Sequence, residues 1–578
     1  MMPEPIRLVV WDLDNTFWDG TLSEGGIAYR ADRAAIVREL AGRGIISSIC
    51  SKNDFAAVRA ILLEDGIWDS FVFPSIDWSP KGPRLARLIE DAQLRPASVL
   101  FIDDSPANLH EARHFVPALQ TRDAGFVAAM LDDPLLAGKP DPGQVRLGHY
   151  RLLEQRGTAR LTAGGDNAAF LRASNIRVRF DRDIEAHMDR AVELIARTNQ
   201  LNFTKFRLPA DATAAREALR ALESHSWVQM ALVHVVDDYG DYGPVGFYAV
   251  IRTASEFRLA HFCFSCRILG MGVESWLYRR LGQPAIDVRG EVLTDLFADD
   301  VIDWIGVGDF DARGVPARSA EFGSAYLRGG CDLHALDHYL RLAARSVTSE
   351  LTVAHRGIEL RIDHTVLLGH ALCPPGADGL AALEDAGYPR EVFRTDLARG
   401  PETPAVYVFS FWADAELLLY RDRLTDLIVP VHFHEFFGQD LTAIPAALFA
   451  ERIDNDAARA VHRFLRDRCE CRGGIGEAEF KANLGAILSH VPVYARVCIV
   501  LLNDTPPGSA MPLLANITRI NRWTSEATTD DARVRLISIR DCVADPAEMH
   551  GPNHFDRKVY HRLAQRVLAT GPGCAVVV

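Results

Sequence analysis

The sequence predicts a multidomain α/β protein with three domains. Its 578 residues are more than one hydrophobic core usually organises. Its 48% apolar and 24% charged residues are typical of a folded globular chain. Near both ends of the chain, short apolar runs alternate with helix-length amphipathic stretches, which is typical of parallel sheets covered by helices.

Charge and hydropathy limit the classes of partner. The formal net charge of -14, without a Lys/Arg-rich block, argues against general binding to nucleic acid. No apolar run reaches the roughly 18 residues of a membrane span. The first residues lack a signal-peptide pattern, so we expect a cytoplasmic protein without a membrane partner. The ten cysteines show no paired spacing, so reduced thiols are expected.

The first domain, residues 1–135, is predicted to contain a Rossmann-like parallel sheet with helices on both faces. Apolar strands are predicted at residues 6–12, 45–51, 71–75 and 98–104. Amphipathic helices are predicted between them, at residues 33–44, 54–66 and 81–93.

Polar side chains follow three of these strands directly. Asp12 and Asp14 follow the first strand, Ser51 ends the second, and Asp103 follows the last, while Lys81 lies between the two later strands. Each carboxylate alone would be explained as an exposed turn residue. Because the carboxyl ends of parallel strands meet at one edge of a sheet, the set together predicts an active site there.

The set supplies what cleavage of a phosphate ester needs. A carboxylate such as Asp12 can attack phosphorus, and Asp14 can protonate the leaving oxygen and then activate water. The negative phosphoryl oxygens require Mg²⁺ and a lysine beside them. In this order the residues resemble the haloacid dehalogenase-like (HAD) phosphatases. That resemblance implies a Mg²⁺ site at Asp12, Asp14, Asp103 and Asp104, and a phosphate site at Ser51, Asn53 and Lys81.

The segment between Asp14 and Ser51 is too short to contain a large lid domain. We therefore expect other domains or a partner to govern access to this site.

The second domain, residues 145–310, is predicted to be α+β and to follow a linker at 135–144. Strands are expected at residues 227–238, 245–252 and 258–269.

Four segments of the first two domains share one resemblance. The segments are "WDLDNTFWDG" (11–20), "IARTNQLNFTKFRL" (195–208), "VVDDYGDYGPVGFYAV" (235–250) and "FCFSCRILGMGVESWLYRRL" (262–281). Together they resemble the FkbH-like family, in which a HAD phosphatase domain is joined to an acyltransferase domain related to GNAT acetyltransferases. The resemblance spans residues 5–310. It implies capture of a glyceryl group from 1,3-bisphosphoglycerate, removal of phosphate, and loading onto the phosphopantetheine thiol of an acyl carrier protein for polyketide or related biosynthesis.

Cys266 is the candidate acyl-relay nucleophile of this domain, because one thiol can pass an acyl group to another with little change in free energy. Arg267 could bind a phosphate. His234 is the preferred base, because strand alternation turns His261 away from Cys266.

Asn199 and Asp241 are candidate substrate ligands. Alternatively, Cys266 is a small buried hydrophobe, and Gly240 and Gly243 only form a turn around Asp241.

The third domain, residues 333–578, is predicted to follow a connection at 308–332 and to be α/β again. Strands are expected at residues 364–370, 405–414, 494–504 and 534–541.

Three segments of this domain are "HTVLLGHALCPPG" (364–376), "VYVFSFWADAELLLYR" (406–421) and "DPAEMHGPNHFDRKVYHRLAQRVL" (545–568). They weakly resemble segments of the flavodoxin-like SGNH hydrolases. The resemblance places Ala371 where those enzymes have the nucleophilic serine and Ala413 where they have the oxyanion-hole asparagine, and it retains only His554. A methyl group cannot replace a hydroxyl nucleophile, so we expect a binding or scaffolding domain without that chemistry.

Two further features of this domain remain open. Cys373 could in principle substitute for the missing serine. His432 and His434 have the spacing of metal ligands on one face of a strand, but no third ligand is evident, so packed or surface histidines are favoured.

The preferred hypothesis is a bifunctional, Mg²⁺-dependent phosphatase and glyceryl transferase. Its expected partners are an acyl carrier protein and a phosphorylated three-carbon donor. One alternative is a phosphatase fused to an acyltransferase that acts on a sugar or another small molecule. The other is a docking scaffold for a carrier protein, with incidental phosphatase activity.

Overall fold

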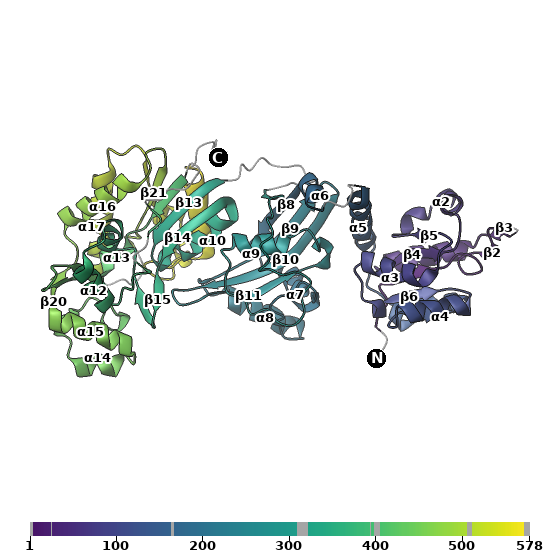
Figure 1. The fold of residues 1–578 in the computed structure, drawn as a ribbon, viewed down its shortest axis with the longest axis horizontal. Coiled ribbons are helices and arrows are strands. Elements are labelled where there is room, and N and C mark those ends of the chain that lie inside the picture. The colour runs from purple at the N-terminus through teal and green to yellow at the C-terminus, as the bar shows by residue number, and fades with distance from the viewer. Residues whose placement is uncertain are drawn as a thin grey trace. The chain divides into compact units, whose positions relative to one another are not determined.

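The computed structural model describes residues 4–24, 26–162, 167–308, 322–392, 395–397, 405–505 and 511–570 (Figure 1). The chain divides into two compact units. The first comprises Met1–Ile176 and Val236–Gly243, and the second comprises Arg177–Val235 and Pro244–Val578. None of the described helices is both long and apolar enough to cross a membrane.

A five-stranded sheet organises the first unit, and its central strand is β1 (Leu8–Trp11). β1 pairs in parallel with β4 (Ile46–Ser51) on one side and with β6 (Val99–Ile102) on the other. The predicted parallel sheet is confirmed. The edge strands are β5 (Ser75–Ile76) and β7 (Gln120–Arg122), in the order β5-β4-β1-β6-β7.

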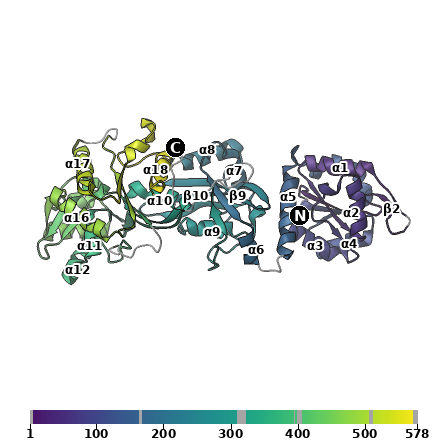
Figure 2. The same ribbon diagram turned by 90° about the horizontal axis from the view of Figure 1, so that it is seen from above.

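Helices cover both faces of this sheet because successive residues of β1 point to opposite sides. Val9 and Trp11 pack in the cluster that contains residues of α1 and α2, whereas Leu8 and Val10 pack with residues of α3 and α4 (Figure 2). The helices that contribute residues to these clusters are α1 (Ala31–Gly42), α2 (Phe55–Glu64), α3 (Lys81–Asp91), α4 (Pro106–Phe115) and α5 (Val145–Thr162). The first unit also contains α6 (Asn167–Ala173).

A small hairpin, β2 (Asp19–Thr21) and β3 (Gly26–Ala28), lies between the first strand and α1. Gly20 has a φ of 96°, and a Cβ there would lie 2.7 Å from the carbonyl oxygen of Gly26, so the turn requires glycine. In the described part of the chain, this hairpin and α1 are the only regular elements between Asp14 and β4.

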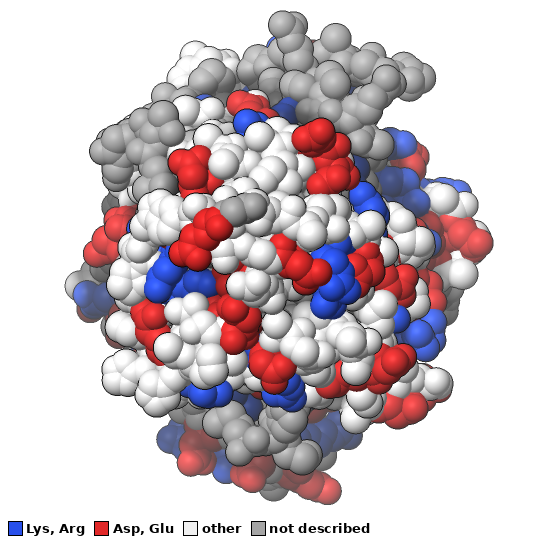
Figure 3. Space-filling view, turned by 90° about the vertical axis from the view of Figure 1, so that its right-hand side faces the viewer, with Lys and Arg blue, Asp and Glu red and all other residues white. Residues whose placement is uncertain are grey.

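Charges of both signs are mixed on the molecular face drawn in Figure 3. Among the described residues visible there, Lys and Arg are interspersed with Asp and Glu. This face therefore lacks the continuous basic surface that binding to a polyanion favours.

A five-stranded sheet begins the second unit, and the three strands predicted for it are present. Residues of α7 (Met188–Arg197) and α8 (Ala212–Glu223) pack on one face of the sheet in a shared core. The strands, in sheet order, are β11 (Phe257–Phe264), β10 (Gly240–Arg252), β9 (Val228–Asp237), β8 (Ile176–Asp181) and β12 (Ile305–Val307), and α9 (Val273–Arg280) follows β11.

The second unit also contains a five-stranded parallel sheet, in the order β14-β13-β17-β21-β22. Residues 322–329, predicted to be part of a connection, form the strand β13 (Phe322–Gly329) instead. Residues 309–321 of that predicted connection lie outside the described residues. The other strands are β14 (Ala344–Leu351), β17 (Ala405–Phe409), β21 (Arg496–Leu501) and β22 (Val534–Ser538).

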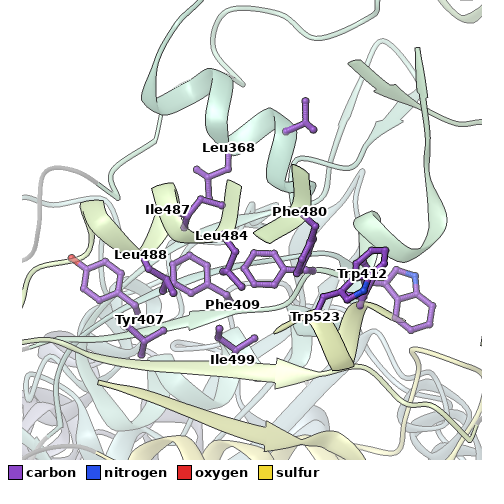
Figure 4. Packing of buried hydrophobic residues seen from close by; sticks show 14 of the residues in the cluster. Leu368, Tyr407, Phe409, Trp412, Phe480, Leu484, Ile487, Leu488, Ile499 and Trp523 are labelled. Carbon is purple, nitrogen blue, oxygen red and sulfur yellow. The ribbon is translucent and has the colours of Figure 1, made fainter. Parts of the chain in front are cut away.

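Two hydrophobic clusters enclose this sheet. Val406 and Val408 of β17 pack with residues of α10 (His334–Ala343) and α18 (Arg557–Leu568). On the other face, Tyr407 and Phe409 pack with residues of α16 (Glu477–His490) and α17 (Met511–Thr528), as Figure 4 shows for Phe480, Leu484 and Trp523.

The outer elements of this part of the unit form two small sheets and four helices. The sheets contain β15 (Val353–His355) with β16 (Ile358–Leu360), and β18 (Leu418–Asp422) with β19 (Ile428–Val431) and β20 (Cys469–Gly473). The helices are α12 (Ala377–Asp385), α13 (Trp412–Glu416), α14 (Ala446–Arg452) and α15 (Asp456–Arg468).

The strand predicted at 364–370 is wrong, because these residues begin the helix α11 (Thr365–Leu372). The buried Asp414 side chain accepts hydrogen bonds from the backbone N–H of Thr365, at 3.0 Å, and from its hydroxyl, at 2.5 Å. A short apolar run suits either a strand or a buried helix. Here a partner 49 positions away along the chain caps the helix.

The resemblance to SGNH hydrolases placed Ala371 in a turn after the first strand of the third domain. Ala371 lies in the last turn of α11, so it is not in a turn after the first strand of the sheet. The first strand is β13, and the residues that follow it are Gly330, Cys331 and Asp332.

Replacing Asp414 with alanine is expected to loosen the start of α11. The loss of a buried hydrogen-bond partner costs about 1–3 kcal/mol. The amides of residues 366–372 should therefore exchange roughly tenfold faster or more. Hydrogen-exchange mass spectrometry of the full chain measures this, with Asp378→Ala, an exposed change in the first turn of α12, as the control. Unchanged exchange in Asp414→Ala would contradict the capping role.

Candidate active site

The first site lies at the carboxyl edge of the first unit's sheet. Asp12 follows β1, Ser51 ends β4, Asp103 follows β6, and Lys81 is the first residue of α3. β1 pairs in parallel with β4 on one side and with β6 on the other, so the carboxyl ends of these three strands lie together. In a parallel sheet, a crevice that can bind a ligand forms where the chain connections run to opposite sides of one strand.

Lys81 forms a buried ion pair with two carboxylates. Its Nζ lies 2.5 Å from Asp12 Oδ1 and 2.7 Å from Asp103 Oδ2. Burial acts to lower the pKa of Lys81, but the two carboxylates outweigh it and hold this pKa above its ordinary value. The lysine therefore carries a charge that fixes both acids in position.

The charges in this cluster favour the binding of a cation. Burial raises the pKa of Asp12 to about 6; Asp103 adds to the shift and Lys81 opposes it. Oxygen atoms of Asp12, Asp103 and Asp104 lie within 4.8 Å of one another. Three carboxylates against one lysine favour a divalent cation, and carboxylate oxygens are the ligands that Mg²⁺ prefers, so the residues fit this ion.

Asp14 does not join that cluster, although the sequence predicted it as a metal ligand. Its Oδ1 accepts hydrogen bonds from Trp18 Nε1, at 2.8 Å, and from the backbone N–H of Leu22, at 3.2 Å. Its Oδ2 accepts one from Asn53 Nδ2, at 3.2 Å. These bonds hold the Asp14 carboxylate beside Trp18, Leu22 and Asn53; its acid/base role stays a prediction.

Ser51 and Asn53 are both buried beside Asp14. Asn53 Nδ2 donates to Ser51 Oγ at 3.1 Å as well as to Asp14. The structure therefore brings these two predicted phosphate ligands together, whereas Lys81 is engaged with Asp12 and Asp103.

Sequence reasoning missed the residues that orient Asp103. Asn108 Nδ2 lies 3.0 and 3.1 Å from its two carboxylate oxygens, and the backbone N–H of Ser105 donates to Oδ1 at 2.8 Å. The spacing that could have revealed them is Asp-x-Ser-x-x-Asn, in which the asparagine lies in the first turn of a helix that follows the strand.

The second candidate site surrounds Cys266, just beyond β11. The partly exposed Cys266 Sγ donates a hydrogen bond to Gln200 Oε1 at 3.0 Å. Ser265 caps the short 3₁₀ turn that contains Cys266, and its hydroxyl also contacts Arg267. Cys266 is therefore not a fully buried hydrophobe, and its side-chain partner is Gln200.

His234, the base predicted for Cys266, does not lie on a strand next to β11. It lies on β9, and β10 separates that strand from β11, which puts the two strands about 10 Å apart. Its Nδ1 instead lies 3.0 Å from Arg179 Nη2. Sequence spacing could not show this, because sheet order decides which strands are neighbours.

His261, which strand alternation predicted to point away from Cys266, is buried. It packs against Phe206 and Phe247, and burial lowers its pKa to about 4. Among the predicted substrate ligands, Asn199 is exposed, and Asp241 accepts a hydrogen bond from the backbone N–H of Gly243 at 2.7 Å. That bond supports the turn interpretation of Asp241, because Gly243 has a φ of 71°.

The remaining candidates from the sequence lie in the second unit. Cys373 is exposed at the end of α11. Ala413 is buried, and its backbone N–H donates to Asp363 at 3.0 Å. His554 lines a cavity together with Cys331 and Asn553.

No family model matches the chain, and no curated protein matches it. The N-terminal part of protein BF1531 from Bacteroides fragilis, which contains a phosphatase domain complexed with Mg, is 22% identical, with a TM-score of 0.21. That match covers 24% of this chain and 41% of the Bacteroides chain, which is less than half of its length.

Two further solved structures resemble part of the chain. The cobalt-bound deoxy-D-mannose-octulosonate 8-phosphate phosphatase from Haemophilus influenzae is 16% identical over 28% of this chain and 96% of its own, with a TM-score of 0.18. The corresponding phosphatase from Moraxella catarrhalis, in complex with magnesium, phosphate and KDO, is 18% identical over 28% and 94%, with a TM-score of 0.17.

Replacing Lys81 with methionine is expected to destabilise the first unit, because it leaves two buried carboxylates without a cation. Breaking a buried ion pair costs about 3–5 kcal/mol. The Tm of this unit should fall, and MgCl₂ should raise it more in Lys81→Met than in the unchanged chain. Thermal scans with and without MgCl₂ measure both effects. Lys139→Met, at an exposed position of the same unit, is the control; an equal Tm in the two variants would refute the prediction.

Proposed function

We propose that the first unit is a Mg²⁺-dependent phosphohydrolase that uses Asp12 as its nucleophile. The observation that carries this proposal is the buried Asp12–Lys81–Asp103 cluster, with Asp104 within coordinating distance, at the carboxyl edge of a parallel sheet. The solved phosphatases that partly resemble the chain agree with this proposal but do not carry it.

The residues of the cluster divide the work of hydrolysis. Asp12 attacks phosphorus, the bond to the leaving oxygen breaks, and Asp14 donates a proton to that oxygen. Asp14 then takes a proton from a water that hydrolyses the aspartyl phosphate and frees Asp12. Mg²⁺ held by Asp12, Asp103 and Asp104 would neutralise the phosphoryl oxygens. Lys81 orients Asp12, and Ser51 and Asn53 offer donors beside it.

Replacing Asp12 with asparagine should reduce phosphate release by at least about 1,000-fold, because loss of a nucleophile removes the covalent route. Malachite-green assays with phosphate monoesters of three-carbon acids and Mg²⁺ measure the rate. Asp91→Asn is the matched control, because Asp91 ends the same helix that begins at Lys81 and is exposed. Full activity in Asp12→Asn would exclude the covalent mechanism.

A second proposed activity is the transfer of a glyceryl group to an acyl carrier protein. The observation that favours it is the partly exposed Cys266, whose thiol is oriented by Gln200 at the end of β11. In this reaction the Cys266 thiolate attacks the acyl carbon of 1,3-bisphosphoglycerate, and inorganic phosphate leaves. The acyl group then passes to the phosphopantetheine thiol. The first unit would remove the remaining phosphate.

Replacing Cys266 with alanine should abolish loading while leaving phosphatase activity unchanged. The purified chain, Mg²⁺, 1,3-bisphosphoglycerate and carrier protein are mixed, and intact-mass spectrometry of the carrier detects the added glyceryl mass. Cys373→Ala, at an exposed cysteine of the same unit, is the control and should load normally. If Cys266→Ala still loads the carrier protein, the relay role of Cys266 is wrong. If the unchanged chain does not load the carrier protein, the proposed transferase function is wrong.

A further inference from the structure

Two histidines and a glutamate meet at the open end of the β18–β19 hairpin. Leu418 pairs with Val431 in this antiparallel hairpin. Glu416 precedes the first strand by two positions, whereas His432 and His434 follow the second. Because antiparallel pairing places both chain ends at the same edge, residues distant in sequence become neighbours there.

The distances between these side chains suit metal coordination. One ligand atom each of Glu416, His432 and His434 lies within 4.8 Å of the other two. The two imidazole rings are 5.0 Å apart, centroid to centroid. A second carboxylate, Glu359 of β16, lies with Oε2 at 3.6 Å from His434 Nε2. The fold therefore supplies the third ligand that the spacing of the histidines alone could not reveal.

Two of these side chains, His432 and Glu416, each have an atom that accepts no hydrogen bond from the described residues and can coordinate a metal ion. His432 Nε2 is inaccessible to solvent and has no hydrogen-bond partner in the described part of the chain. Glu416 Oε2 accepts hydrogen bonds from Arg361 Nη1, at 2.5 Å, and from Trp412 Nε1, at 2.9 Å. Within the same described residues, no hydrogen bond reaches Glu416 Oε1. The carboxylate is thus held in place with one oxygen left to coordinate.

The charge balance also favours a cation. Arg361 binds Asp363 through two hydrogen bonds, of 3.0 and 2.9 Å, so its charge already has a buried counterion. Glu416 and Glu359 then contribute two negative charges beside the imidazoles. A divalent ion would neutralise them.

The cluster borders a cavity. Glu359, Glu416 and His434 line a hollow of about 410 Å³ in the second unit, whose lining also includes Cys331 and His554. An ion bound to these side chains would have an open coordination position toward this hollow, as in metal sites that take a water or small-molecule ligand.

We propose that Glu416, His432 and His434, assisted by Glu359, bind a divalent transition-metal ion of the zinc class. Imidazole nitrogens combined with carboxylate oxygens suit Zn²⁺, whereas Mg²⁺ prefers oxygen ligands alone. This site belongs to the second unit and is independent of the phosphatase proposed for the first.

The test uses the full chain loaded with ZnCl₂ and dialysed against buffer that contains excess Mg²⁺, which competes for the carboxylate cluster of the first unit. The number of zinc ions bound per chain is measured by elemental mass spectrometry of the dialysed protein. We expect about one zinc per chain in the unchanged protein and in Asp103→Asn. The double variant His432→Gln/His434→Gln should lose it, and Glu416→Gln should bind at least about tenfold more weakly.

The control is the pair of exposed histidines His114 and His490, whose replacement by glutamine should leave the zinc content unchanged. Zinc should also raise the Tm of the unchanged chain but not that of the double variant. The metal-free Tm of each variant shows whether it is folded. The proposal is overturned if the unchanged chain retains no zinc, if the folded double variant retains as much as the unchanged chain, or if Asp103→Asn alone loses it.

Discussion

The buried ion pair of Lys81 with Asp12 and Asp103 is the interaction on which the first unit depends. Three strand ends and the start of α3 meet at this point, and each contributes a polar group to an otherwise apolar sheet. Two carboxylates so close together would repel each other strongly without the lysine. Asp104 adds a third carboxylate, so the cluster has an excess of negative charge that favours a divalent cation.

The second unit contains a comparable network around Arg361, which bridges Asp363 and Glu416 while almost fully buried. Asp363 in turn accepts from the backbone N–H of Ala413, and the adjacent Asp414 caps α11. The position of α13, and therefore of Glu416, follows from these bonds. The donors of the buried guanidinium have fixed directions, so Asp363 and Glu416 are both held in defined orientations.

The proposed activities use chemistry of different kinds. The first unit offers oxygen ligands and a carboxylate nucleophile, which suit phosphoryl groups. The second offers a partly exposed thiol at Cys266 and, in another part, imidazole nitrogens beside a cavity. Processing of a phosphorylated acyl donor needs a group that attacks phosphorus and a thiol that accepts an acyl group. This is the physical reason to consider phosphatase activity and acyl transfer together in one chain.

Alternation of apolar runs and amphipathic stretches determined the first sheet and the polar residues at its edge, because parallel strands must place their carboxyl ends together. The same reasoning failed at 364–370, where a short apolar run suits a strand or a helix equally, and Asp414, distant in sequence, decided between them. It also misplaced β13, a strand predicted to be part of a connection.

Local sequence determined which side chains are available, and tertiary structure decided which of them meet. Asp12 and Asp103 could be paired from the sequence, because each directly follows a strand. The separation of the His234 strand from β11 could not be predicted until the order of β9, β10 and β11 was known. Likewise, the contact of Glu416 with His432 and His434 depends on pairing across a hairpin, which residue spacing within one segment does not encode.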